Sequence, residues 1–351
     1  MHRDDIPQDV MALLQRGTVI PAHPLALDAG RRLDPRRQRA LTRYYLDAGV
    51  GGMAVGVHTT QFAIREAGLY EPVLRLAAEQ AREWVPRPVV MIAGACGPTA
   101  QARREASIAR ALGYHAVLLS LGAMAHAGED ELIAHCRAVA QEMPLVGFYL
   151  QTAVGGPVLP PTFWRRFAEI ENVVAIKIAP FHRYRTLDVL RGVALARAED
   201  RITLYTGNDD HIVLDLLAPF ALRRGSEEVT LRIRGGLLGH WSVWTQKAVQ
   251  YFARVQAEAA KDSASAAMLA LDSQVTDANS AFFDVANDFA GCIAGCHEVL
   301  RRQGLLEGTW CLDPHEGLSP GQADEIDRVY RDYPHLNDDG FVREHLARWL
   351  A

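Results

Sequence analysis

The feature of this 351-residue sequence that most constrains its fold is a regular alternation of short apolar runs with longer segments of helical period. Continuous apolar runs separated by amphipathic helices predict parallel strands that are covered on their outer face. Eight such pairs within roughly 240 residues favour a closed (β/α)8 barrel over an open doubly wound sheet. The predicted strands cover residues 18–22, 51–55, 88–94, 115–120, 144–150, 173–179, 202–207 and 235–243.

The segments between these runs carry helix start signals. In the first, Asp34 is the expected N-cap and Pro35 stands at the first helical position. The remaining helices are predicted to begin near Glu71, at the cap Thr99, near Asp130 and near Pro161, and to occupy residues 186–197, 210–223 and a stretch through Tyr251. No G-x-G-x-x-G follows an early strand, which weakens a dinucleotide-binding alternative.

The chain divides into three parts. Residues 1–16 form an N-terminal extension, residues 17–261 the barrel, and residues 262–351 a helical region that we expect to pack against the barrel. The Ser/Ala-rich stretch "KDSASAAM" is the expected hinge between the last two parts. The predicted fold class is therefore α/β, a TIM barrel with a C-terminal helical extension.

Charge and composition exclude several classes of function. The formal net charge of −5 provides no broad basic surface, which argues against nucleic acid or an anionic membrane as a partner. No segment approaches ~18 uninterrupted apolar residues, and the first ten residues lack the basic and apolar blocks of a signal peptide. We therefore expect a cytoplasmic protein.

The cysteines and histidines do not predict a cross-link or a metal site. The five cysteines are an odd set without C-x-x-C spacing, and Cys292 and Cys296 are interpreted as small buried residues on one helix. No pair of histidines shows the spacing H-x-x-x-H or a similar ligand pattern. We expect no metal and no other cofactor.

A single lysine stands inside one of the predicted strands. The chain has 37 Lys and Arg residues but only three lysines, and Lys177 lies in the middle of "VVAIKIAP". Burial lowers the pKa of a lysine, and the neutral amine attacks carbonyl carbon atoms to form a Schiff base. The alternative interpretation is a side chain that only extends from the barrel rim to water.

Other polar residues follow the predicted strands, at the end where a barrel places its active site. A Schiff base with a 2-oxo acid needs a proton-transfer group, and Tyr149 supplies a phenol one strand away. The carboxylate needs hydrogen-bond donors, which Thr59 and Thr60 supply. Core packing of Tyr149 and loop capping by the threonines are the alternatives. Further candidate substrate-binding residues at strand ends are His58, Gly207, Asn208 and His240.

The arrangement resembles the dihydrodipicolinate synthase and N-acetylneuraminate lyase group of pyruvate-dependent class I aldolases. The resemblance runs from about residue 19 to at least residue 318, and it rests on the motifs "VHTTQF", "GFYLQTAVGG", "VVAIKIA" and "TGND". It implies that Lys177 is the Schiff-base lysine and Tyr149 the proton-transfer phenol. By the same resemblance, the adjacent Thr59 and Thr60 bind the substrate carboxylate.

The sequence also departs from that family. The family's usual G-T-T-G-E loop is replaced by "HTTQF", and both the Tyr-Tyr-Asn element after strand 4 and the arginine after the strand-5 tyrosine are missing. These departures argue against aspartate semialdehyde as the acceptor, and we expect a neutral aldehyde instead. The segment "RGSEEVTLRIRGG" is longer than the family norm and predicts a hairpin at the base of the barrel.

Two hypotheses for function remain. The leading one is a lyase, an aldolase or a hydro-lyase, that forms an imine between Lys177 and pyruvate or a related 2-oxo acid. The family resemblance implies a homodimer or homotetramer. The alternative, motivated by the altered "HTTQF" loop, is a non-catalytic member of the same barrel family that binds a metabolite.

Overall fold

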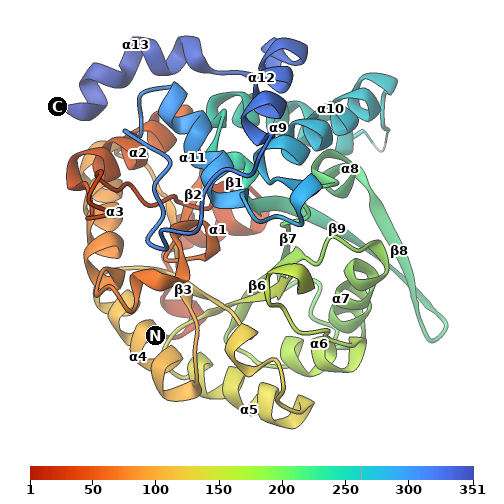
Figure 1. Ribbon diagram of the computed structural model, residues 1–351. Coiled ribbons are helices and arrows are strands. Elements are labelled where there is room, and N and C mark those ends of the chain that lie inside the picture. Colours follow the sequence, from red (N-terminus) through yellow and green to blue (C-terminus); the bar gives the residue numbers. More distant parts are fainter. Residues whose placement is uncertain (262) are drawn as a thin grey trace.

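The computed structural model describes residues 1–261 and 263–351. Among these residues, eight parallel strands pair in the order β1-β9-β7-β6-β5-β4-β3-β2. A parallel bridge between Ala22 and Ala54 brings the two ends of this sheet together, so the predicted TIM barrel is confirmed (Figure 1). Its strands are β1 (Val19–Pro21), β2 (Gly52–Val55), β3 (Val90–Ala95), β4 (Ala116–Leu119), β5 (Leu145–Leu150), β6 (Val173–Ala179), β7 (Thr203–Thr206) and β9 (Glu227–Leu238).

Helices surround the strands as the sequence predicts. The Asp34 carboxylate accepts hydrogen bonds from the N–H groups of Arg36 and Arg37, which confirms the predicted N-cap. The predicted cap Thr99 is wrong by one residue, because Pro98 is the N-cap and the Thr99 hydroxyl contacts the ring of His135. The barrel helices are α2 (Pro35–Ala48), α3 (Tyr70–Trp84), α4 (Thr99–Ala111), α5 (Glu129–Ala140), α6 (Pro161–Ala168), α7 (Arg183–Leu195), α8 (Ile212–Leu217) and α9 (Thr245–Ala259).

The segment between β7 and β9 differs from the prediction. The helix predicted over residues 210–223 ends at Leu217, because Pro219 cannot continue it and disfavours helical geometry at the preceding residue. Residues 219–224 instead form β8 (Pro219–Arg224), which pairs antiparallel with the first half of β9. The predicted hairpin is thus confirmed, and it projects beyond the helices in Figure 1. At the other end, β9 stops at Leu238 and residues 240–242 form a 3-10 turn.

The two ends of the barrel are covered differently. At the base, α1 (Gln8–Arg16) packs Val10 and Leu14 against inward-facing strand residues, and the Tyr205 hydroxyl donates to the Leu14 carbonyl at 2.8 Å. At the opposite end lies α11 (Cys292–Arg302), whereas α10 (Ala266–Phe282) packs against α8 and α13 (Asp339–Leu350) against α2 (Figure 1). The helix α12 (Gln322–Asp332) contacts α10 and α11. The expected domain boundary at Asp262 lies outside the described residues. Within the described ranges, no helix is both long and apolar enough to cross a membrane.

Candidate active site

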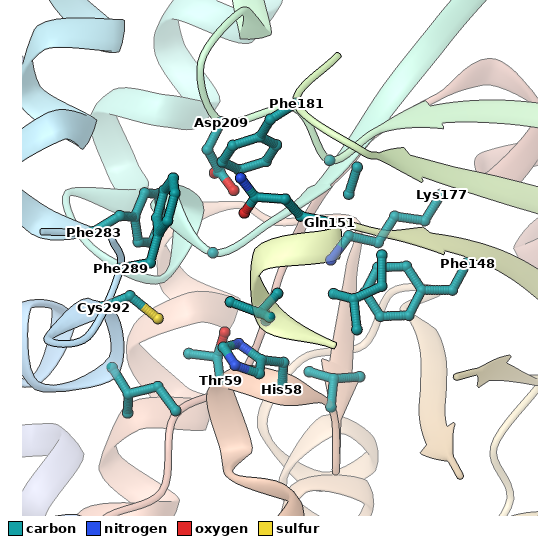
Figure 2. Close-up of a pocket in the computed structure, with 18 of the residues that line it drawn as sticks. His58, Thr59, Phe148, Gln151, Lys177, Phe181, Asp209, Phe283, Phe289 and Cys292 are labelled. Carbon is teal, nitrogen blue, oxygen red and sulfur yellow. The ribbon is translucent and has the colours of Figure 1, made fainter. Parts of the chain in front are cut away.

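Lys177 extends from β6 into a cavity at the carboxyl end of the barrel (Figure 2). Its side chain is largely buried, with 8% of the residue exposed, and Nζ lies 4.5 Å from the centre of the Phe148 ring. Burial lowers the pKa of the Lys177 amine to about 8, while the negative charge of Asp209 partly offsets this effect. The alternative in which the side chain only reaches from the rim to water does not fit this burial.

Asp209 follows β7 and also lines the cavity. One carboxylate oxygen, Oδ1, accepts a hydrogen bond from the backbone N–H of His240 at 3.0 Å. Burial raises the pKa of Asp209 to about 7, and the His240 N–H and the Lys177 charge oppose that rise. The sequence predicted Gly207 and Asn208, the two residues before Asp209, as site residues but not Asp209 itself, although the run "NDD" after an apolar strand was the available signal.

Gly207 and Asn208 follow β7 and differ in how they contribute to the site. A Cβ atom on Gly207 would lie 2.6 Å from Cε of Lys177, so only glycine leaves space for the lysine side chain. The Asn208 side chain faces the protein interior, where its amide donates to Thr186 and Asp215. Asn208 is therefore absent from the cavity wall, and its role in substrate binding stays a prediction that this geometry does not support.

Tyr149 does not meet Lys177. Phe148, not Tyr149, is the Cα partner of Lys177 in the β5–β6 ladder, and successive strand residues face opposite sides. Tyr149 therefore points outward, where its ring packs against Trp164 and its hydroxyl accepts from the Leu159 N–H at 3.1 Å. The predicted proximity of a phenol to the lysine is wrong, and the core-packing alternative describes Tyr149 correctly.

The two threonines after β2 have different surroundings. Thr59 lines the cavity, as does the adjacent His58. The Thr60 hydroxyl instead donates to the His23 carbonyl at 2.6 Å and accepts from the N–H groups of Gly56 and Val57, so it stabilises the loop. Burial and the nearby Lys177 charge lower the pKa of His58 to about 4, which keeps its imidazole neutral.

The C-terminal helices complete the cavity. Phe283, Phe289 and Cys292 lie across from Lys177 and Phe148 in Figure 2. Cys296 also lines this wall, so the two cysteines interpreted as small buried residues are wall residues as well. His240 does not line the cavity, because its ring stacks against Phe282 and only its backbone reaches Asp209.

The cavity is small. Its volume is about 80 Å³, roughly half that of the ~150 Å³ cavity that holds a benzene ring. Its polar lining consists of His58, Thr59, Gln151, Lys177 and Asp209, together with the weakly polar thiols. No group of three His, Cys, Asp or Glu side chains that could hold a metal occurs in residues 1–261 and 263–351. The expectation that no cofactor is needed stays a prediction.

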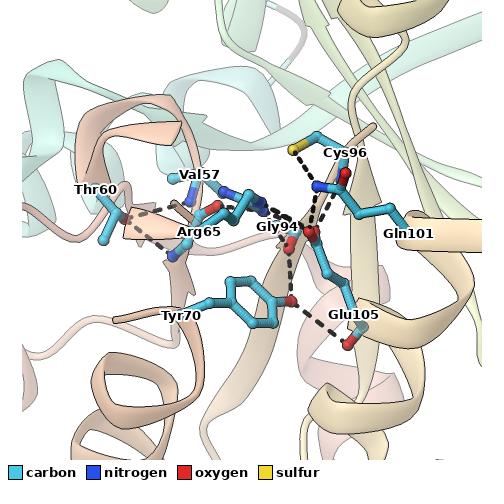
Figure 3. Close-up of polar contacts among 9 residues, drawn as sticks. Val57, Thr60, Arg65, Tyr70, Gly94, Cys96, Gln101 and Glu105 are labelled. Atoms are coloured by element: carbon cyan, nitrogen blue, oxygen red, sulfur yellow. Dashed lines mark hydrogen bonds and ion pairs between the residues drawn. The ribbon is translucent and has the colours of Figure 1, made fainter. Parts of the chain in front are cut away.

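A second buried charge pair lies beside the threonine loop (Figure 3). The Arg65 guanidinium contacts the Glu105 carboxylate of α4 at 3.0 Å and also donates to the carbonyl groups of Gly56 and Gly94. Glu105 in turn accepts from the Cys96 N–H at 3.1 Å. These bonds fix the loop after β2 to the end of β3.

Sequence comparison assigns the chain to a family. The family model of the dihydrodipicolinate synthetase family matches residues 16–220, which is more than half of the sequence. The chain therefore belongs to the dihydrodipicolinate synthetase family. The match includes the cavity residues from His58 to Asp209, whereas the wall formed by residues 283–296 lies beyond it.

Curated relatives of this family member are distant. A 4-hydroxy-tetrahydrodipicolinate synthase from Synechocystis sp. is 29% identical over 67% of this chain and 69% of its own length. One from Nitratidesulfovibrio vulgaris is 24% identical over 53% of this chain. The chain spans only 61% of the length of that relative, and 60% of a synthase from Persephonella marina.

Solved structures share the fold over most of both chains. A protein titled CdNal from Clostridium difficile, solved with mannosamine, has a TM-score of 0.71 at 15% identity and covers 90% of this chain and 99% of its own. YagE, a prophage protein of the dihydrodipicolinic acid synthase family from E. coli solved with pyruvate, has a TM-score of 0.71 at 17% identity, with coverages of 91% and 98%. At such identities the likeness shows the fold alone.

Proposed function

We propose that the protein is a lyase that forms a Schiff base between Lys177 and pyruvate or a related 2-oxo acid. The observation that carries the proposal is a lysine amine buried in a cavity at the catalytic end of the barrel. Its lowered pKa of about 8 supplies some neutral amine at neutral pH, and the neutral amine is the form that attacks a ketone.

The cavity supports a small substrate. A volume of about 80 Å³ suits a three-carbon acid better than a large ring system. We assign the carboxylate to Thr59, with His58 and Gln151 as neutral polar neighbours, because these side chains line the same cavity as Lys177. Hydrogen bonds from neutral donors hold a carboxylate without requiring a cation.

Borohydride trapping tests this proposal. The protein is incubated with pyruvate and sodium borohydride, digested, and analysed by mass spectrometry for a reduced pyruvyl adduct. We expect the adduct on the Lys177 peptide and not on the Lys247 or Lys261 peptides, which serve as internal controls. An unmodified Lys177 peptide at saturating pyruvate would contradict the proposal.

One observation favours the alternative, a non-catalytic member that binds a metabolite. Phe148 occupies the inward position beside Lys177, so no phenol lies next to the amine. Calorimetric binding of pyruvate without any trapped adduct would support this alternative.

The acceptor side supports a neutral partner. In the described part of the chain, no arginine lines the cavity. Arg183 is paired with the buried Asp215 carboxylate, and Arg185 contacts Thr152 outside the cavity. Aromatic rings on the opposite wall suit an uncharged acceptor, so we propose an aldehyde without a second carboxylate. Turnover of aspartate semialdehyde that equals the best neutral aldehyde would contradict this assignment.

We further propose a cytoplasmic homodimer or homotetramer. All five cysteines are unpaired, which suits a reducing compartment. The oligomeric state follows from the habit of the family rather than from a feature of this chain. Light scattering coupled to size-exclusion chromatography would measure it, and a monomer at micromolar concentration would contradict it.

A further inference from the structure

Schiff-base chemistry needs more than the lysine. Loss of water from the carbinolamine requires an acid, and formation of an enamine requires a base that removes a proton from C3 of the substrate. The sequence suggested Tyr149 for these steps, but its hydroxyl lies outside the cavity beside the Leu159 N–H. The inward residue at this level is Phe148, which has no proton to transfer.

The remaining lining residues can be compared. His58 has a pKa lowered to about 4 by burial and by Lys177, so it is a weak base at neutral pH. Burial raises the pKa of the Cys292 thiol to about 12, so it stays protonated. Thr59 and Gln151 do not titrate near neutral pH. Among the described lining residues, Asp209 is the carboxyl group.

The position of Asp209 suits contact with a substrate on Lys177. The two residues come from the carboxyl ends of adjacent strands β7 and β6, and Gly207 leaves room for the Lys177 side chain, since a Cβ there would lie 2.6 Å from its Cε. The backbone N–H of His240 fixes Oδ1, whereas Oδ2 has no hydrogen-bond donor among the described residues. Figure 2 shows the carboxylate directed into the cavity that Lys177 enters.

We propose that Asp209 is the catalytic residue that transfers protons to and from the substrate, in the place of a phenol. The inference rests on the proposed Schiff base at Lys177. As an acid, Asp209 protonates the carbinolamine hydroxyl, which leaves as water while the nitrogen lone pair forms the C=N bond. The carboxylate then removes a C3 proton; the C–H electrons form the C2=C3 bond, and the C=N π electrons return to nitrogen.

The surroundings of Asp209 support both halves of this cycle. The groups that face it are Lys177 of β6, Asp210 of the same loop, Tyr251 of α9, and Cys292 and Cys296 of α11. Burial raises the pKa of the phenol and of both thiols, so these three groups stay uncharged near neutral pH. The Lys177 charge opposes the rise in the pKa of Asp209, and the Asp210 charge adds to it. Burial also raises the pKa of Asp209 to about 7, where donation and acceptance of a proton are both accessible.

Two measurements on Asp209→Asn separate imine formation from proton transfer at carbon. Asparagine retains an oxygen that can accept from the His240 N–H, so we expect the fold to persist. Borohydride trapping reports the imine, and proton NMR in D2O reports exchange of the C3 protons of pyruvate. We expect trapping to continue, although more slowly, and the exchange rate to fall by roughly 10²–10⁴.

Asp200→Asn is the matched control, because Asp200 is exposed, does not line the cavity and has no charge effect on Asp209. It should leave both readouts unchanged. Exchange by Asp209→Asn within about threefold of the parent protein would overturn the assignment. Absence of trapping in the parent protein would overturn the proposed function and this inference together.

Asp209→Glu provides a second test if the asparagine variant does not fold, which circular dichroism would reveal. It keeps the carboxyl group but moves it by one methylene. Slower exchange with trapping retained would support the proposal. An equal loss of trapping and exchange in a folded variant would show a structural role for Asp209 and overturn the proposal.

Discussion

Two buried pairs of opposite charge lie at the carboxyl end of this barrel, and they differ in almost every physical respect. Arg65 and Glu105 are in contact at 3.0 Å and share further hydrogen bonds with backbone groups (Figure 3). Lys177 and Asp209 both line a cavity, and no ion-pair contact within 4.0 Å joins them in the described residues. One pair fills its space, whereas the other leaves space for a ligand.

The difference shows how a buried charge becomes structural or reactive. At Arg65, burial disfavours the charge, but the hydrogen bonds with Glu105 and the charges of neighbouring groups together outweigh it and raise the guanidinium pKa. At Lys177 and Asp209, burial prevails and moves the two pKa values toward each other, to about 8 and about 7. Arginine cannot be deprotonated in practice, so only the second pair can exchange protons near neutral pH.

The largest expected effect is the loss of the trapped adduct after substitution of Lys177, in the pair that it forms with Asp209. Lys177→Arg replaces the amine by a group that cannot become a neutral nucleophile, so we expect the borohydride-trapped adduct to disappear while the fold persists. Lys261→Arg, at an exposed position, should trap pyruvate like the parent protein. A trapped adduct that survives in Lys177→Arg would assign the nucleophile to another residue.

Substitution in the Arg65–Glu105 pair is expected to change the stability of the protein rather than its reactivity. Glu105→Gln leaves the Arg65 guanidinium buried without its counter-charge, and we expect the free energy of unfolding to fall by about 3–5 kcal/mol. Asp209→Asn removes a charge that has no ion-pair contact and should cost less than about 1 kcal/mol. Urea denaturation of both variants measures this contrast, and similar losses would remove the distinction between the two pairs.

The pH dependence of trapping tests the lysine directly. The groups facing Lys177 are Asp209 and His58, and with a pKa of about 8 the free-amine fraction rises on the order of 50-fold from pH 6 to pH 8. Because free amine is gained while the acid form of Asp209 is lost, we expect the initial rate of trapping to rise from pH 6 to a maximum between about pH 7 and pH 8 and to fall above it. A rate still rising tenfold per unit near pH 10 would indicate an unperturbed lysine.

The adjacent threonines differ in the same way, because Thr59 lines the cavity and the Thr60 hydroxyl is hydrogen-bonded within the loop. Thr60→Val removes a hydroxyl with three hydrogen-bond partners and should lower the free energy of unfolding by about 1–3 kcal/mol. Thr59→Val should leave stability unchanged but weaken pyruvate binding by about 1–3 kcal/mol, as measured by calorimetry. A loss of binding in Thr60→Val and a loss of stability in Thr59→Val would contradict this assignment.

The smallest effect is expected at Tyr149. Tyr149→Phe removes the acceptor for the Leu159 N–H, which we expect to cost about 1 kcal/mol of stability. Trapping and C3 exchange should stay at the level of the parent protein, because the hydroxyl faces the helix layer. A large loss of exchange would place the phenol in the reaction after all and would contradict the role given to Asp209.

Much of the fold was predictable because each signal is local. Apolar runs and helical periods predicted all eight barrel strands, and the side chain of Asp34 capped its helix as expected. The errors also have local causes. The helix α8 ends before Pro219, and the residues from Pro219 onward form a strand instead of continuing the predicted helix. The last predicted strand ends at Leu238, and a 3-10 turn follows where the sequence predicted strand.

The candidate site was only partly predictable. The sequence indicated that Lys177 is exceptional, and it placed Thr59 and His58 at a strand end beside it. It did not indicate that Cys292 and the phenylalanines near it complete the wall, because they lie more than 100 residues away from the lysine in the chain. Asp209 is one of three consecutive polar residues, 208–210, and the sequence did not indicate which of them would line the cavity. The conformation of the loop places Asp209 there, whereas the Asn208 side chain faces the interior.

The sequence by itself determined the order of strands and helices, the family resemblance and the lysine. Only the tertiary structure decided which of the neighbouring residues Phe148 and Tyr149 faces that lysine. The strands of a parallel barrel are apolar on both faces, so "LVGFYL" contains no alternation of polar and apolar residues from which its inward face can be read. Strand pairing fixed the register, and a shift of one residue would have exchanged the two rings.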